Sequence, residues 1–151
     1  MRVLVDTNVY VSRLLVGSRQ NSGVTRIIDA AILDEYTLLV PEEVLEELRG
    51  LRDRKAYLRD RITQRDVDDL IRVLQGVAII LPRQTDPIPA VLRDPKDDFL
   101  LVAAVFGDAD ILVTGDRDLI DIRAHLDRPK ILTVAEFVDL LGSPSLVNQR
   151  L

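Results

Sequence analysis

The sequence contains no cysteine and a single histidine, His125, among its 151 residues. Without cysteine the chain cannot form disulfide bonds or thiolate metal sites. One histidine without a second histidine or a cysteine does not make a zinc site, so we interpret His125 as structural. Any bound metal must therefore rely on oxygen ligands.

Long hydrophobic runs are also absent. The apolar stretches are short, as at 77–81, whereas a membrane-spanning helix needs about 20 consecutive apolar residues. The amino-terminal residues reach the acidic Asp6 before the apolar region of a signal peptide could form. We therefore expect a cytoplasmic protein without a membrane partner.

The chain has no basic excess, since 20 Lys and Arg residues stand against 25 Asp and Glu residues and the net charge is -5. This balance is opposite to that of most nucleic-acid binders. Acidic residues gathered around a divalent cation would still permit binding of a polyanion, because the cation neutralises them.

The length and the 47% hydrophobic content favour one domain, which we expect at 1–141, followed by a C-terminal tail at 142–151.

Short apolar runs alternate with segments of helical periodicity along the chain. Buried strands are expected at 2–5, 37–40, 77–81, 111–113 and 131–133, and helices at 9–16, 24–33, 41–51, 63–76, 97–106 and 134–141. Pro41 is expected in the first turn of its helix, Thr63 and Asp66 form a capping box, and Gly76 is expected to end that helix. The stretch 82–95, with four prolines, is expected to be an irregular connection.

Strands that alternate with helices predict an α/β fold, a three-layer α/β/α arrangement with a parallel five-stranded sheet. In such sheets the functional site lies beyond the carboxyl ends of the strands, where the strand order reverses. Asp6 follows the first strand and Asp116 follows the fourth, so both are expected at this edge. Further carboxylates open two helices: Asp97, Asp98, Glu42, Glu43, Glu46 and Glu47.

Clustered carboxylates repel one another and raise one another's pKa values unless a cation lies between them. Oxygen-only ligands favour Mg²⁺ or Mn²⁺ over Zn²⁺, and such ions activate water and stabilise a phosphoryl group in transit. Each acid also has a structural interpretation. Acids in the first turn of a helix are favoured by its dipole, whereas Glu47 lies beyond that turn.

Four ordered motifs resemble the PIN domain family, in particular the small prokaryotic PIN proteins of the toxin kind. They are Leu-Val-Asp-Thr-Asn at 4–8, Pro-Glu-Glu-Val-Leu-Glu-Glu-Leu at 41–48, Asp-Pro-Lys-Asp-Asp-Phe at 94–99 and Leu-Val-Thr-Gly-Asp-Arg-Asp-Leu at 112–119. The resemblance covers residues 2 to about 141. It implies a parallel five-stranded sheet and an endoribonuclease that uses Mg²⁺ or Mn²⁺ held by three or four acids.

Carried over onto this sequence, the family's acids are Asp6, Glu47, Asp98 or its neighbour Asp97, and Asp116. The family's ungapped spacing to Thr114 favours Asp98 as the third ligand. Thr7, Asn8 and Thr114 match polar positions beside that centre, and Pro41 stands where the family often has Ser or Thr.

The resemblance makes RNA and a second copy of the chain the expected partners, and a cognate antitoxin protein a candidate partner. The basic residues of 49–61 are the best RNA surface, and Arg52, Lys55 and Arg59 have a spacing that would place them on one helical face. A solvated helix face is the alternative interpretation of that stretch.

Two other functions fit an α/β protein with acids at strand ends. A receiver-like regulatory domain needs an Asp after the third strand and a Lys after the fifth, but the sequence has Leu81-Pro82-Arg83 at the first position and Lys130 before the fifth strand. A catalytically silent protein-interaction module, which keeps its acids for folding, remains the alternative to a nuclease.

Overall fold

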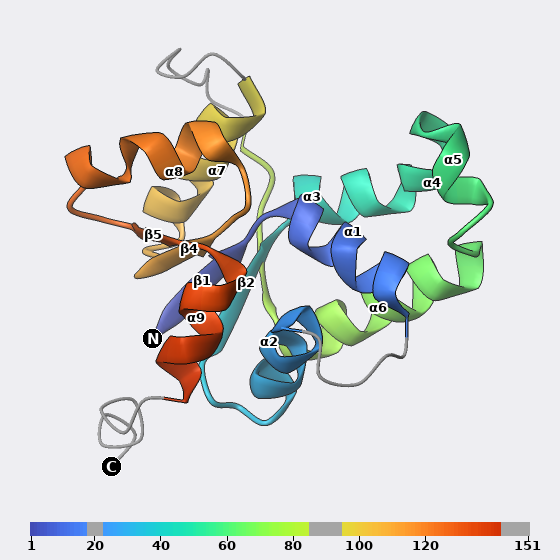
Figure 1. The fold of residues 1–151 in the computed structure, drawn as a ribbon, viewed down its shortest axis with the longest axis horizontal. Coiled ribbons are helices and arrows are strands. Elements are labelled where there is room, and N and C mark those ends of the chain that lie inside the picture. The colour runs from blue at the N-terminus through green and yellow to red at the C-terminus, as the bar shows by residue number, and fades with distance from the viewer. Residues whose placement is uncertain (18–22, 85–94, 143–151) are drawn as a thin grey trace.

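The computed structural model describes residues 1–17, 23–84 and 95–142, with the side chains of 95–98 excepted (Figure 1). The expected irregular connection therefore lies mostly outside the described residues, and so does most of the expected tail. Across the described ranges, no helix combines the length and the hydropathy needed to cross a membrane.

Five parallel strands form one sheet in the order β3-β2-β1-β4-β5 (Figure 1). The strands are β1 Arg2–Val5, β2 Thr37–Pro41, β3 Ile79–Leu81, β4 Ile111–Val113 and β5 Lys130–Leu132. β1 is the central strand, and Val5 lies beside Val113 of β4. β2 and β3 lie on one side of β1, and β4 and β5, which come later in the sequence, lie on the other side. The strand order therefore reverses between β1 and β4.

Helices cover both faces of this sheet. The helices are α1 Thr7–Val16, α2 Gly23–Ile32, α3 Glu42–Arg49, α4 Leu51–Arg54, α5 Ala56–Arg59, α6 Gln64–Val77, α7 Pro95–Phe106, α8 Arg117–Ile122, the 3-10 turn η1 Arg123–His125 and α9 Val134–Leu141. Together with the parallel sheet they confirm the three-layer α/β/α arrangement.

The alternation of side chains along each strand divides the core into two parts. Val3 and Val5 of β1 pack with the helices α1, α2, α3, α6 and α9 in the larger core. Leu4, which points to the opposite face, packs with α7 and α8 in a smaller core that contains Leu100 and Leu119. The part of a strand that is buried on both faces must be apolar, which is the pattern that residues 3–5 and 111–113 show in the sequence.

Capping side chains fix several helix starts. The expected capping box of α6 is present, since Asp66 N–H donates to Thr63 Oγ1 and Thr63 N–H donates to Asp66 Oδ2. Thr133 and Glu136 form a second capping box at the start of α9. Each box satisfies two backbone N–H groups that the first helical turn would otherwise leave without partners.

The third strand differs from its expected form. Helix α6 continues through Gly76 to Val77, and β3 begins only at Ile79, whose side chain is 45% exposed. β3 is an edge strand that pairs with β2 alone, so its face is not buried as expected. A glycine within a helix costs about 1 kcal/mol relative to alanine, and the buried contacts of Leu70 and Leu74 outweigh that cost here.

Two expected boundaries move by one residue. Pro41 is the last residue of β2 and the N-cap of α3, so it does not lie in the first turn of the helix as expected. Its φ of -64° and ψ of 146° are extended, which suits both roles. The fifth strand runs from Lys130 to Leu132, because the Thr133 side chain caps α9.

The basic stretch 49–61 does not form one helix. It folds as two short helices, α4 and α5, with Lys55 between them in an extended conformation at φ -130° and ψ 103°. The expectation that Arg52, Lys55 and Arg59 share a helical face is therefore wrong, because it assumed continuous helical geometry across Lys55.

Candidate active site

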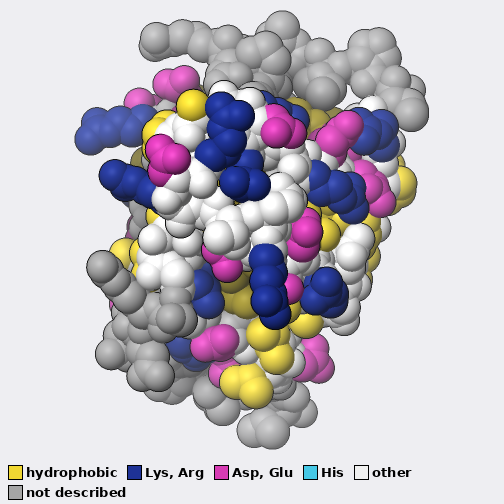
Figure 2. Space-filling model, turned by 90° about the vertical axis from the view of Figure 1, so that its right-hand side faces the viewer, with side chains coloured by type: hydrophobic (Ala, Val, Ile, Leu, Met, Phe, Trp, Pro, Cys, Tyr) yellow, Lys and Arg dark blue, Asp and Glu magenta, His cyan; other side chains and the backbone are white. Residues whose placement is uncertain are grey.

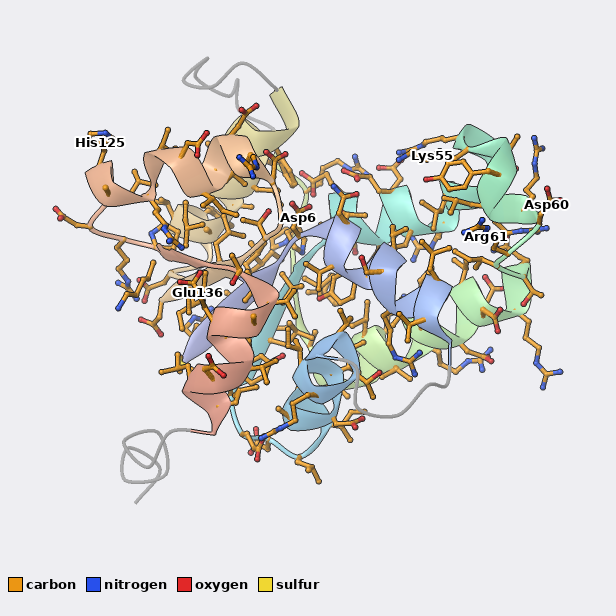
Figure 3. All side chains as sticks on the ribbon, viewed as in Figure 1. Asp6, Lys55, Asp60, Arg61, His125 and Glu136 are labelled. Atoms are coloured by element: carbon orange, nitrogen blue, oxygen red, sulfur yellow. The ribbon has the colours of Figure 1, made fainter. Side chains whose placement is uncertain are left out.

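The turns after β1 and β4 bring Asp6 and Asp116 to one place. β1 and β4 are adjacent and parallel, and the Asp6 N–H donates a 2.9 Å hydrogen bond to the carbonyl of Val113, so β1 stays in register up to its last residue. The strand order reverses at this point, which is where open α/β sheets bind their ligands. In Figure 3, Asp6 lies near the centre of the molecule, where β1 meets α1.

Thr114 connects the two acidic residues. Its Oγ1 donates to Asp6 Oδ2 at 2.8 Å and accepts from the Asp116 N–H at 3.0 Å. Thr114 is fully buried, and Asp6 is 6% exposed. One hydroxyl therefore holds the carboxylate of the β1 turn and the backbone of the β4 turn in a fixed relation.

Burial raises the pKa of the Asp6 carboxyl, and the charge of Asp116 raises it further. The hydrogen bonds from Thr114 and from the Asn8 backbone lower the pKa, but burial is the largest effect. The Asn8 N–H lies 3.5 Å from Asp6 Oδ1, which is a long hydrogen bond. Ionisation of Asp6 is thus unfavourable in the metal-free protein. A nearby cation would stabilise the ionised carboxylate and offset this cost.

Both acidic residues also cap helices. Asp6 is the N-cap of α1, and Asp116 is the N-cap of α8, where its Oδ1 accepts from the Asp118 N–H at 2.8 Å. This structural use was the alternative interpretation of an acid at a strand end. The structure shows that the capping role and the pairing of Asp6 with Asp116 occur together.

The four glutamates of α3 have different surroundings. Glu43 Oε2 accepts from the Gln84 N–H at 3.1 Å, and Glu46 forms an exposed 2.6 Å ion pair with Arg83, which lowers the pKa of Glu46. These two residues attach α3 to the chain that follows β3. Glu42 and Glu47 are both half-buried, and neither has a hydrogen bond or ion pair in the described part of the chain. Both carboxylates are thus available on α3, and only the resemblance of the motif to the family favours Glu47.

Helix α7 begins at Pro95 and therefore includes Asp97 and Asp98 in its first turn, as expected. The side chains of both residues lie outside the described residues, so the choice between them stays a prediction. Among the side chains that are described, no group of three or more acidic or histidine residues is close enough to hold a metal ion. The structure brings Asp6 and Asp116 together, and the ligand roles of Glu47 and Asp98 remain proposals.

The sequence matches a known protein family over most of its length. The sequence model of the PIN domain family matches residues 2–118, which is more than three quarters of the chain. This chain belongs to the PIN domain family. It is also 25% identical over 124 residues to an uncharacterized protein of Methanocaldococcus jannaschii, a match that covers 82% of this chain and 76% of that protein.

The residues of this PIN domain fit a hard divalent cation. The donors that the structure places at the switch point are carboxylate oxygens, and one of them is buried and raised in pKa. Mg²⁺ and Mn²⁺ prefer such oxygen ligands. His125 lies on η1, is exposed and lies away from Asp6 in Figure 3.

The polar residues beside Asp6 have separate roles. Thr7 is buried in the first turn of α1, and Asn8 is exposed and contacts Asp6 through its backbone. Sequence reasoning placed Thr114 beside the centre but did not predict that it joins Asp6 to Asp116. It also missed Tyr10, one helical turn after Asp6. The buried hydroxyl of Tyr10 has no hydrogen-bond partner among the described residues, and its pKa is raised by burial, by Tyr36 and by Asp6. The i, i+4 spacing was the signal available for Tyr10.

Two residues of the basic stretch 49–61 lie away from this centre. In Figure 3, Lys55 and Arg61 are at the outer end of the molecule, whereas Asp6 is central. Figure 2 shows the side on which α4, α5 and α6 lie, and its basic side chains are interspersed with acidic ones. An RNA that contacts both the basic stretch and Asp6 would have to extend across this side of the PIN domain.

Proposed function

We propose that this PIN domain is a metal-dependent endoribonuclease that hydrolyses RNA phosphodiester bonds. The observation that carries the proposal is the pairing of Asp6 with Asp116 through Thr114 at the strand-order reversal. A buried carboxylate beside a second carboxylate is unfavourable unless a cation neutralises both. The membership of the chain in a nuclease-like family supports the same chemistry.

Asp6, Asp116, Glu47 and Asp98, or Asp97 in its place, would hold Mg²⁺ or Mn²⁺. When bound, such an ion activates water and stabilises negative charge on a phosphoryl group. The chain contributes a fixed carboxylate, because the Thr114 hydroxyl donates to Asp6 Oδ2 and the Asn8 N–H lies 3.5 Å from Asp6 Oδ1. Preorganised ligands of this kind lower the cost of binding the ion.

We further propose that the protein is the toxin of a toxin–antitoxin pair in the cytoplasm, with RNA, a second copy of the chain and a cognate antitoxin as partners. This part of the proposal rests on the resemblance of the four motifs to PIN toxins. A small open reading frame directly beside the gene, whose product relieves growth arrest when both are expressed, would support it. Growth without arrest on expression of the chain alone would contradict it.

The test of the nuclease uses Asp6→Asn. Cleavage of an end-labelled single-stranded RNA in Mg²⁺ or Mn²⁺ is expected in the unmodified protein and should fall at least 100-fold in the variant, because a charged ligand is lost without loss of core volume. Asp121→Asn is the matched control, since it makes the same change at an exposed position on α8. Unchanged cleavage by Asp6→Asn would refute the proposed centre.

A second measurement separates the enzyme from the silent interaction module. A ligand that binds only the folded state raises the melting temperature. Mn²⁺ should therefore stabilise the unmodified protein and Asp121→Asn, but stabilise Asp6→Asn much less. Absence of a metal effect in all three proteins, together with absence of cleavage, would favour the silent module instead.

A further inference from the structure

The segment 49–61 differs in charge from the chain as a whole. It contains six Lys and Arg residues and two Asp residues, although the full sequence has more acids than bases. Lys55, Arg59 and Arg61 have exposed side chains, which form no hydrogen bond or ion pair within the ranges that the structure describes. Lys55 and Arg61 lie together at the outer end of the molecule (Figure 3). Their positive charges are therefore available to a polyanion.

An exposed aromatic ring lies within this basic segment. Tyr57 of α5 is 56% exposed, whereas the other two tyrosines, Tyr10 and Tyr36, are buried. The hydrophobic core therefore makes little use of the Tyr57 ring. Aromatic side chains interleaved with basic ones are typical of surfaces that bind single-stranded nucleic acid, because bases stack on the rings while the cations contact the backbone.

The core holds α5 in one orientation. Leu58 and Ile62 are buried in the larger core, and the Ile62 N–H donates a 2.8 Å hydrogen bond to the carbonyl of Leu58. This bond continues the helical turn beyond Arg59, so Arg61 lies one turn after Tyr57, as Ile62 lies one turn after Leu58. Tyr57 and Arg61 are thus neighbours on one flank of α5, and the buried pair fixes that flank toward solvent.

We propose that Tyr57 stacks on an unpaired base of RNA while Arg61 and Lys55 contact the adjacent phosphates. The proposal rests on the proposed nuclease function for the choice of RNA, and it makes single-stranded RNA the substrate class. Every base has a flat face that an aromatic ring can cover, whereas the bases of a duplex already stack on one another. An acidic peptide would match the basic side chains but would make no use of the exposed ring.

The test measures RNA binding by fluorescence anisotropy in EDTA, where a metal-dependent nuclease does not cleave its ligand. Tyr57→Ala should weaken binding of a single-stranded oligouridine of about 12 nucleotides by about 5-fold or more, because one stacked base is lost. Tyr57→Phe should bind like the unmodified protein, since phenylalanine keeps the ring. Phe106→Ala is the matched control, because it removes a similarly exposed aromatic ring from α7 and should leave binding unchanged.

Two further ligands separate stacking from charge. An abasic strand of the same length keeps the phosphates without the bases, and an RNA duplex has bases that are not accessible to a ring. Tyr57→Ala should leave the affinity for both of them unchanged. Arg61→Gln should weaken binding of all three ligands and reduce its salt dependence, because a phosphate contact is lost in each case.

Unchanged binding of the single strand by Tyr57→Ala would overturn the proposal, and so would an equal loss for the abasic strand. An acidic peptide that binds this surface in place of RNA would also overturn it, because the surface would then belong to a protein partner. RNA binding without cleavage in Mg²⁺ or Mn²⁺ would contradict the nuclease proposal alone. Cleavage without an effect of Tyr57→Ala on binding would contradict the stacking proposal alone, so the two failures are distinguishable.

Discussion

Replacing Thr114 by valine tests whether its hydroxyl holds the candidate active site together. Valine keeps the shape of the side chain but removes the donor to Asp6 Oδ2 and the acceptor of the Asp116 N–H. A hydrogen bond to an ionised group contributes about 1.5–3 kcal/mol, and a neutral one about 0.5–1.5 kcal/mol. Thr114 is fully buried, so water cannot take the place of the lost hydroxyl. We therefore expect a loss of about 2–4 kcal/mol in the free energy of unfolding at neutral pH.

The loss should depend on pH. Burial raises the folded-state pKa of Asp6 above its unfolded value, so ionising Asp6 costs stability in the metal-free protein, and this cost sets in as pH rises through the folded-state pKa. The Thr114 hydrogen bond lowers that pKa and reduces the cost. Thr114→Val should therefore destabilise least at the acidic end of the range and most above the folded-state pKa of Asp6.

Urea denaturation of the metal-free protein between pH 4 and pH 8 measures both effects. Thr114→Ser is the control, because it keeps the hydroxyl and removes one methyl group, at a cost of about 1 kcal/mol that should not vary with pH. The serine variant should also keep the Mn²⁺ response that the valine variant loses. Equal stability of the two variants at every pH would show that the hydroxyl does not hold Asp6.

Three further predictions follow from other residues. Tyr10→Phe should leave stability unchanged or raise it by about 1 kcal/mol, because the buried hydroxyl that it removes has no partner in the part of the chain that the structure describes. A clear fall in melting temperature would contradict this. Asp98→Ala should abolish cleavage, whereas Asp97→Ala should cost only about 0.3–1 kcal/mol of stability at the start of α7, and the reverse pattern would move the ligand by one residue. Glutamine at Arg52, Lys55 and Arg59 should weaken RNA binding for all sequences and reduce the log-log salt slope by about 0.7 per lost contact. An unchanged slope would assign that surface to solubility.

The sequence by itself determined the fold class and the neighbouring positions of Asp6 and Asp116. Apolar strands such as 2–5 and 111–113 are buried on both faces, so their composition does not depend on which strand lies beside them, and a parallel arrangement follows from the helices between them. Asp6 and Asp116 could be predicted to lie near each other because Asp6 directly follows β1, Asp116 lies in the turn after β4, and these two strands end at the same edge. The capping box of Thr63 is a local pattern and was equally readable.

Only the tertiary structure decided the features that depend on neighbours distant in sequence. Ile79 is exposed because β3 is at the sheet edge, which its own composition does not reveal. The basic stretch breaks at Lys55 although its spacing is helical, because packing of Leu51 and Leu58 into the core overrides local propensity. The bond from Thr114 to Asp6 joins residues 108 positions apart, and such a contact exists only once β1 and β4 are side by side.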